Sequence, residues 1–102
     1  MKTSKEDFRY FISRCEYWKN KLHLNHWRIR YEHLDLGNVC YAQNQGWLVS
    51  AKAVIRLNKD WKNSGDQELT KDSLDETALH EVLHLLYKYP EEELIVRLTR
   101  II

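Results

Sequence analysis

The chain is poor in the residues that interrupt regular secondary structure, with three glycines and one proline among 102 residues. This scarcity excludes a proline-rich or glycine-rich linker, and no low-complexity segment or internal repeat is present. A length near 100 residues is about enough for one domain and too short for two. With 43% apolar and 30% charged residues, the composition is that of an ordinary globular protein rather than a disordered chain. We expect one domain over residues 1–102.

An excess of charge of one sign and a long apolar run are also missing. The 16 Lys and Arg residues nearly balance the 15 Asp and Glu residues, and the formal net charge of +1 gives no electrostatic footprint for nucleic acid. No apolar run approaches the roughly 18–20 residues that a membrane-spanning helix needs. We therefore expect neither a nucleic-acid partner nor a membrane partner.

Cysteine is scarce, and the two residues present, Cys15 and Cys40, have neither CxxC nor zinc-knuckle spacing. Such an isolated pair indicates reduced thiols in a reducing compartment. The first residues of the chain also become charged where the apolar stretch of a signal peptide would lie. Together these observations predict a cytoplasmic protein.

The first regular segment predicted from the sequence is a helix over residues 4–22. Ser4 and Asp7 resemble a capping box, in which each side chain accepts a hydrogen bond from the backbone of the other residue. Apolar residues recur at spacings of three and four, the pattern of one buried helix face: Phe8, Phe11, Ile12, Cys15, Trp18 and Leu22. This helix is expected to serve as scaffold.

The middle of the chain changes to a period of two, which predicts strands. Apolar and polar residues alternate over residues 27–32, and two further strands are expected over residues 39–45 and 51–58. Because the connections are short, with Gly46 at a turn or bulge, we expect an antiparallel three-stranded sheet. The polar residues 59–72 are expected to form a loop.

The last third of the chain is predicted to be helical again. Ser73 and Glu76 form a second capping-box pattern, and apolar residues continue at helical spacing until Tyr89 and Pro90. A short helix is expected to follow Pro90, with three consecutive glutamates in its first turn. The fold class predicted from these elements is α+β.

The second predicted helix contains the motif His80-Glu81-Val82-Leu83-His84, or HExxH. Residues four apart lie on the same helix face, so the imidazoles of His80 and His84 can converge on one ion. Zinc accepts such nitrogen ligands at about 2.0–2.1 Å in a tetrahedron. Glu81 is rotated by about 100° from His80, so it flanks the metal without ligating it and can take a proton from zinc-bound water. The motif predicts a zinc site with His80 and His84 as ligands and Glu81 as general base.

A catalytic zinc ion usually takes three protein ligands and a water, so HExxH leaves one ligand to be found. No histidine follows His84, and Tyr87 stands where the longer HExxHxxGxxH signature has its glycine. The remaining ligand should then be a carboxylate, and Glu91, Glu92 and Glu93 lie just past the predicted end of the helix. The helical phase aligns Glu91 best with the apolar side of the last helix, with the other two glutamates flanking it.

The segment from Glu76 to Leu86, followed by an acidic and then apolar helix, resembles minimal gluzincins. These are small zincin-like metallopeptidase domains, often of bacteriophage or prophage origin. The order of elements (a helix, three strands, the HExxH helix and a glutamate helix) resembles that family as well. The resemblance implies a zincin-like fold and a bound zinc ion, held by His80, His84 and Glu92, with Glu81 as general base. It also implies a peptide substrate extended along an edge strand, for which residues 46–58 are expected.

The function expected from the sequence is that of a zinc-dependent metallopeptidase, which hydrolyses peptide bonds through a zinc-activated water. The alternative is a zinc-binding interaction or regulatory module that keeps the fold without protease turnover, since so small a domain leaves little room for a two-sided cleft. A third possibility is a metal-free structural domain in which the two histidines are incidental.

Overall fold

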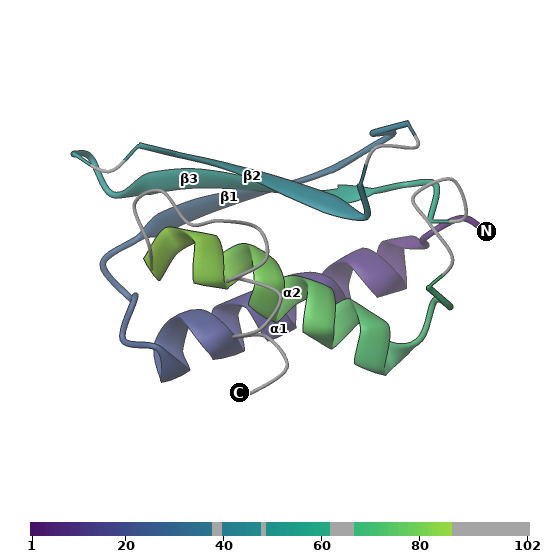
Figure 1. The fold of residues 1–102 in the computed structure, drawn as a ribbon, viewed down its shortest axis with the longest axis horizontal. Helices are drawn as coiled ribbons and strands as arrows, with labels where there is room; N and C mark the ends of the chain where they lie inside the picture. The colour runs from purple at the N-terminus through teal and green to yellow at the C-terminus, as the bar shows by residue number, and fades with distance from the viewer. Residues whose placement is uncertain (38–39, 48, 62–66, 87–102) are drawn as a thin grey trace.

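The computed structural model of the chain describes residues 1–37, 40–47, 49–61 and 67–86. These residues form a small α+β domain, as the change of period along the sequence predicted (Figure 1). In chain order the elements are α1 (Lys5–Lys21), β1 (Arg28–Leu34), β2 (Ala42–Trp47), β3 (Lys52–Asn58) and α2 (Lys71–Leu86).

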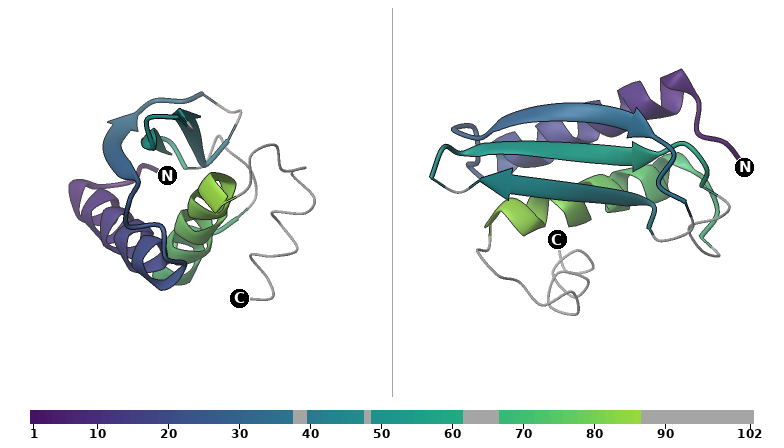
Figure 2. Two further views of the ribbon diagram at one scale, coloured as in Figure 1. Left: turned by 90° about the vertical axis from the view of Figure 1, so that its left-hand side faces the viewer. Right: turned by 90° about the horizontal axis from the view of Figure 1, so that it is seen from above.

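The two helices lie side by side on one face of the sheet (Figure 1, Figure 2). Seen from above the sheet, β1 lies over α1 and β2 lies over α2, with β3 between them (Figure 2, right). Polar contacts join the helices as well, because Asp75 Oδ1 accepts from Arg14 Nε at 2.7 Å and from Trp18 Nε1 at 2.8 Å. Among the described residues no helix covers the opposite face of the sheet.

The sheet is mixed, so the expected antiparallel arrangement is wrong for one of its two strand pairs. The strand order is β1-β3-β2, and β3 pairs in parallel with β1 and antiparallel with β2. The reason lies in the composition of β3, in which Ala53, Val54, Ile55, Leu57 and Asn58 are all buried. A strand with so many buried positions is stabilised most where both neighbours and a helix layer cover it.

Gly46, expected at a turn or bulge, lies inside β2 and is paired in regular register with Ala53 of β3. A methyl group at this position would lie 3.7 Å from both Leu85 and Trp27, at ordinary van der Waals distance. The strand therefore runs through Gly46 and ends at Trp47.

The ends of the helices depend on short polar side chains. At α1 the predicted capping box is confirmed: the Ser4 N–H donates to Asp7 Oδ2 at 2.8 Å, and the Asp7 N–H donates to Ser4 Oγ at 3.0 Å. At α2 the box predicted for Ser73 and Glu76 is wrong, since the reciprocal pair is Thr70 and Ser73. The Ser73 N–H donates to Thr70 Oγ1 at 3.0 Å, and the Thr70 N–H donates to Ser73 Oγ at 2.8 Å. A hydroxyl at the third helical position replaces the usual carboxylate, and the capping pair lies three residues earlier than expected.

The core fills the space between the sheet and the helices. Its largest fully buried apolar side chains come from both helices, from β3 and from the segment after β3: Phe11, Cys15, Ile55, Leu57, Trp61, Leu74, Val82 and Leu83. Trp61 falls in the stretch predicted to be a loop. Its ring lies 4.3 Å from that of Tyr41, and its Nε1–H donates to the carbonyl oxygen of Gln67 at 2.7 Å. The polar composition of residues 59–72 concealed this core residue.

Neither helix of the described part of the chain is long and apolar enough to cross a membrane. Cys15 and Cys40, both of which the structure describes, are not joined by a disulfide bond. Burial raises the pKa of the Cys15 thiol well above its ordinary value. This side chain is therefore protonated at neutral pH and packs as a small apolar group.

The last predicted elements lie outside the described residues. The structure describes α2 as far as Leu86. The helix end expected at Tyr89 and Pro90, the short glutamate helix after it and Glu92 as third zinc ligand all fall beyond that residue.

Candidate metal centre

The position of the site follows from the three sides of α2. One side packs into the main core, and its buried residues include Ala78 and Val82. A second side, with Leu79 and Leu83, packs against Trp18 of α1 and against Leu22, the residue that caps the end of α1. Since each residue turns the helix by about 100°, the two motif histidines lie on the third side of α2, which packs neither against the main core nor against α1.

The side chains of His80 and His84 converge as the four-residue spacing predicted. Their Nε2 atoms lie 3.4 Å apart, and their ring centroids are 5.1 Å apart. Two nitrogens that each lie about 2.0–2.1 Å from one tetrahedral zinc ion are separated by about 3.4 Å. The spacing of the two imidazoles therefore matches the edge of a zinc coordination tetrahedron.

Glu81 lies between the histidines and the core. Its side chain is buried, with 5% of its surface exposed, whereas both histidines are half-buried. One ligand atom from each of the three residues can be chosen so that all lie within 4.8 Å of one another. His80, Glu81 and His84 thus form a group that could hold a metal ion.

Glu81 is held by a residue that the sequence reasoning did not identify. Asn44 of β2 donates a hydrogen bond from Nδ2 to Glu81 Oε2 at 2.7 Å. Asn44 pairs with Ile55 on the face of the sheet that looks toward the helices. The signal was present in the alternation of residues 42–47, which places one amide on an otherwise small and apolar inner face. A polar side chain at an inward position of a strand needs a buried partner.

The strand beside the candidate metal site is β2. The expectation that residues 46–58 form the edge strand for a peptide substrate is therefore wrong. Residues 46–58 were expected to form that edge, but β3 supplies most of them and is the central strand. β2 is an edge strand, lies over α2 and contributes Asn44 to the site (Figure 2, right). An extended chain beside the histidines would thus meet β2.

The negative charge of Glu81 also affects the pKa of a thiol outside the metal-binding group, that of Cys40. Burial raises the pKa of Cys40, and the negative charge of Glu81 raises it further, against a smaller opposite effect of a hydrogen bond with Gln43. A raised pKa keeps this thiol protonated at neutral pH. Since a metal binds the thiolate, Cys40 offers a poorer ligand than the two imidazoles.

The donors present therefore fit a zinc ion: two imidazole nitrogens at tetrahedral spacing, with a carboxylate at their side. The third ligand expected from the sequence, Glu92, lies outside the described residues. Comparisons of the chain with protein-family models, with curated proteins and with solved structures find no match.

Proposed function

We propose that the chain is a zinc-dependent peptidase in which His80 and His84 hold the ion and Glu81 is the general base. The observation that carries the proposal is the 3.4 Å separation of the two Nε2 atoms. Two imidazole nitrogens at this separation could both act as ligands of one tetrahedral zinc ion. The sequence-based expectation of Glu92 as third ligand completes the proposed set.

A bound zinc ion would supply a Lewis acid that polarises a peptide carbonyl and makes water more acidic. The remaining chemistry belongs to the chain's own residues. Glu81 takes a proton from the attacking water and passes it to the nitrogen of the leaving amine, so its carboxylate is regenerated in each cycle. The hydrogen bond from Asn44 to Oε2 orients the Glu81 carboxylate for this transfer.

The proposed substrate is a peptide segment that adds to the outer edge of β2. An edge strand offers unpaired backbone N–H and C=O groups to an extended chain. β2 is the edge strand that reaches the metal-binding group through Asn44. We propose a reducing compartment such as the cytoplasm as its place of action, since Cys15 and Cys40 are not joined by a disulfide bond.

The burial of Glu81 favours a second candidate, a zinc-binding interaction module without turnover. A carboxylate with 5% of its surface exposed is less accessible to a substrate water than a base at an open cleft. In this case the ion would stabilise the fold, and a partner peptide would bind at the β2 edge without being cleaved.

Metal content and turnover, measured on the full chain, separate these candidates. We expect about one zinc per chain, lost in His80→Ala and in His84→Ala, with an exposed histidine variant, His26→Ala, as the matched control. Zinc should also raise the unfolding temperature, because a ligand that binds only the native state adds RT ln(1 + [L]/Kd) to its stability. Protein that takes up no zinc when the ion is added in excess would exclude both candidates.

Glu81→Gln distinguishes the base from the ligands. Glutamine can still accept the Asn44 hydrogen bond but cannot hold an abstracted proton, so zinc binding and fold should persist. If the chain is a peptidase, cleavage of a peptide library should fall by about 10²–10⁴-fold, the usual loss for general-base catalysis. A zinc-loaded wild type that binds peptides but cleaves none identifies the interaction module.

A further inference from the structure

The sheet face turned away from the helices carries a group of charged and aromatic side chains. The strand register places Arg28, Lys52 and Trp47 in one row across this face, followed by the row Arg30, Val54 and Gln45. The next row contains Glu32, Arg56 and Gln43. The three rows thus run across all three strands on the uncovered side of the molecule (Figure 1).

This face is strongly positive although the chain as a whole is nearly neutral. Its rows hold four cationic side chains and one carboxylate, a net charge of +3, whereas the whole chain has a formal charge of +1. Glu32 is bound to Arg56, with an Nε–Oε1 distance of 2.7 Å, and lies 3.6 Å from an Arg30 nitrogen. Arg28 and Lys52, in the row farthest from Glu32, are the cations of this face that have no carboxylate partner among the described residues. The uncompensated charge is therefore concentrated where β1 and β3 begin.

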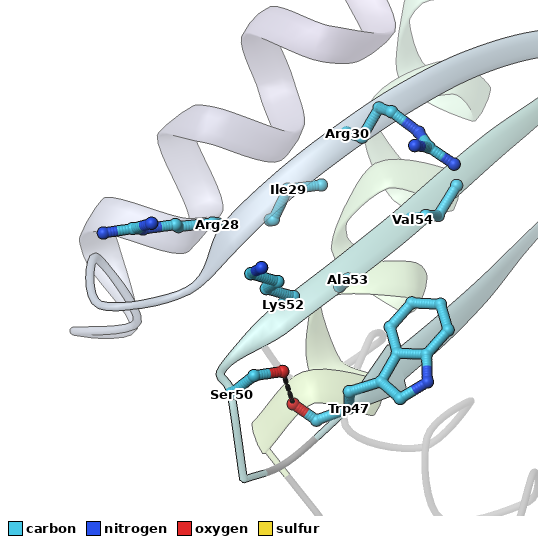
Figure 3. A pocket seen from close by; sticks show the side chains of 8 residues that line it. All are labelled: Arg28, Ile29, Arg30, Trp47, Ser50, Lys52, Ala53 and Val54. Atoms are coloured by element: carbon cyan, nitrogen blue, oxygen red, sulfur yellow. Dashed lines mark hydrogen bonds between the residues drawn. The ribbon is translucent and has the colours of Figure 1, made fainter.

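A hollow of about 450 Å³ lies over this end of the sheet. Its lining includes three cations, Arg28, Arg30 and Lys52, and no acidic residue. In Figure 3 Val54 and the backbone of Ala53 form the floor between Arg30 and Trp47, while Arg28 extends away from Trp47. A cavity of this volume is in the range of small-molecule sites, which run from roughly 300 to 1,000 Å³.

Trp47 gives the hollow an aromatic wall. The side chain is 47% exposed, and its indole N–H makes no hydrogen bond to another described residue. An open indole face in a hollow lined by cations suits a ligand with a planar ring and a negative charge, because the ring can stack while cations such as Lys52 bind the anion. A bound peptide would instead need main-chain pairing at a strand edge, and this hollow lies on the face of the sheet.

We propose that the hollow binds a nucleoside phosphate, with the base stacked on Trp47 and the phosphate bound by Lys52 and Arg30. Ammonium and guanidinium groups form charge-assisted hydrogen bonds with phosphate oxygens, and the Arg30 guanidinium can offer two of them at once. The low net charge of the chain argues against an extended nucleic-acid surface but does not conflict with one charged hollow. The site lies on the far side of the sheet from α2, so it is independent of the proposed zinc site.

Calorimetric titration of the full chain tests the proposal, with adenosine 5′-monophosphate as the probe. Adenosine, which lacks the phosphate, and inorganic phosphate, which lacks the ring, should each bind at least about tenfold more weakly. Lys52→Gln and Trp47→Leu should each weaken binding of the monophosphate at least about fivefold, because one removes a phosphate donor and the other the stacking surface. The matched control is Lys71→Gln, an exposed lysine at the start of α2, which should bind like the wild type. His80→Ala should also leave this binding unchanged.

A ten-residue oligothymidylate distinguishes the two sources of the same chemistry. Binding of the oligonucleotide more than about a hundredfold tighter than the monophosphate assigns the hollow to single-stranded nucleic acid, and comparable or weaker binding assigns it to a free nucleotide. The proposal is overturned if neither probe binds saturably at millimolar concentration. It is overturned equally if hexaglutamate binds as tightly as the monophosphate, or if Lys71→Gln weakens binding as much as Lys52→Gln, since charge alone would then explain the result.

Discussion

Asn44 of β2 and Glu81 of α2 are joined by a 2.7 Å hydrogen bond from Nδ2 to Oε2, across 37 positions of the chain. The bond connects the edge strand with the helix that carries the metal-binding group. A buried carboxylate is stable when polar groups replace the water it has lost, and Asn44 is one such group. The orientation of Glu81 therefore depends on the sheet as much as on its own helix.

Removal of this donor should destabilise the fold. Asn44→Ala leaves the buried Glu81 carboxylate without its amide partner, and we expect a loss of about 1–3 kcal/mol in the free energy of unfolding. Urea unfolding of the metal-free protein measures the loss. Gln45→Ala, at the neighbouring exposed position of β2, is the control and should change stability by less than about 0.5 kcal/mol. Equal effects of the two substitutions would contradict a supporting role for Asn44.

The third zinc ligand is tested by single substitutions of the three consecutive glutamates. If one of them binds the ion, its replacement by glutamine should weaken zinc binding far more than replacement of the other two. The resemblance to minimal gluzincins identifies Glu92 as that residue, whereas the helical phase favours Glu91. Zinc affinities of Glu91→Gln, Glu92→Gln and Glu93→Gln, measured by competition with a chelator, decide between them. Three equal affinities would mean that none of these glutamates is a ligand.

The stability of the protein should fall in mild acid because of His33. Burial lowers the pKa of His33 from its ordinary value near 6.5, and the charge of Lys59 lowers it further against the opposite effect of Asp7. The ring is stacked on Phe8 with centroids 4.8 Å apart, and Nε2 lies 2.6 Å from Thr3 Oγ1. Since the hydroxyl proton of Thr3 is donated to the Asn58 carbonyl oxygen, His33 Nε2 is the donor in this pair.

Because the folded state binds the proton of His33 less readily than the unfolded state, stability is retained above the ordinary pKa. It is lost as the pH falls from about 6.5 through the lower pKa of the folded state. His33→Gln should reduce this dependence, measured as the change in unfolding free energy between pH 7.5 and 5.5. The exposed His26→Gln is the control and should retain the dependence of the wild type. A His33→Gln protein with the wild-type slope would show that other groups cause it.

Asn58 should be among the residues least tolerant of substitution. It is fully buried, and its Oδ1 accepts from the backbone N–H groups of Leu36 and Asp60, each at 3.0 Å. Its Nδ2 donates to the carbonyl oxygens of Gly37 at 2.8 Å and Cys40 at 2.9 Å. Three of these four bonds attach the segment between β1 and β2 to the end of β3, and the fourth, from Asp60, fixes the turn of the chain after β3. Asn58→Asp places an oxygen against two carbonyl oxygens, and we expect a loss of about 3 kcal/mol or more.

The control for this substitution is Asn25→Asp. Asn25 is exposed and makes one side-chain hydrogen bond, from Nδ2 to Asn20 Oδ1 at 2.8 Å. Its change to aspartate should cost less than about 1 kcal/mol in unfolding free energy, measured in urea at the same pH. Similar losses for the two variants would contradict the role assigned to Asn58.

The sequence by itself determined the local parts of this structure. The capping box of Ser4 and Asp7 and the convergence of His80 and His84 join residues three or four positions apart. The helical repeat sets such distances whatever the rest of the chain does, so both could be predicted before any tertiary contact was known. The same holds for the alternation that assigns each strand an inner and an outer face.

Only the tertiary structure decided which strands are neighbours and which group meets Glu81. Alternation identifies the two faces of a strand but not its partners, so β3 was expected at an edge and instead lies at the centre. That order makes β2 the edge strand over α2 and brings Asn44 to Glu81. It also places Lys52 between Arg28 and Trp47 on the uncovered face. Which strands become neighbours depends on the apolar surface that all the elements bury together in the folded domain. The spacing of residues along the chain does not reveal that buried surface.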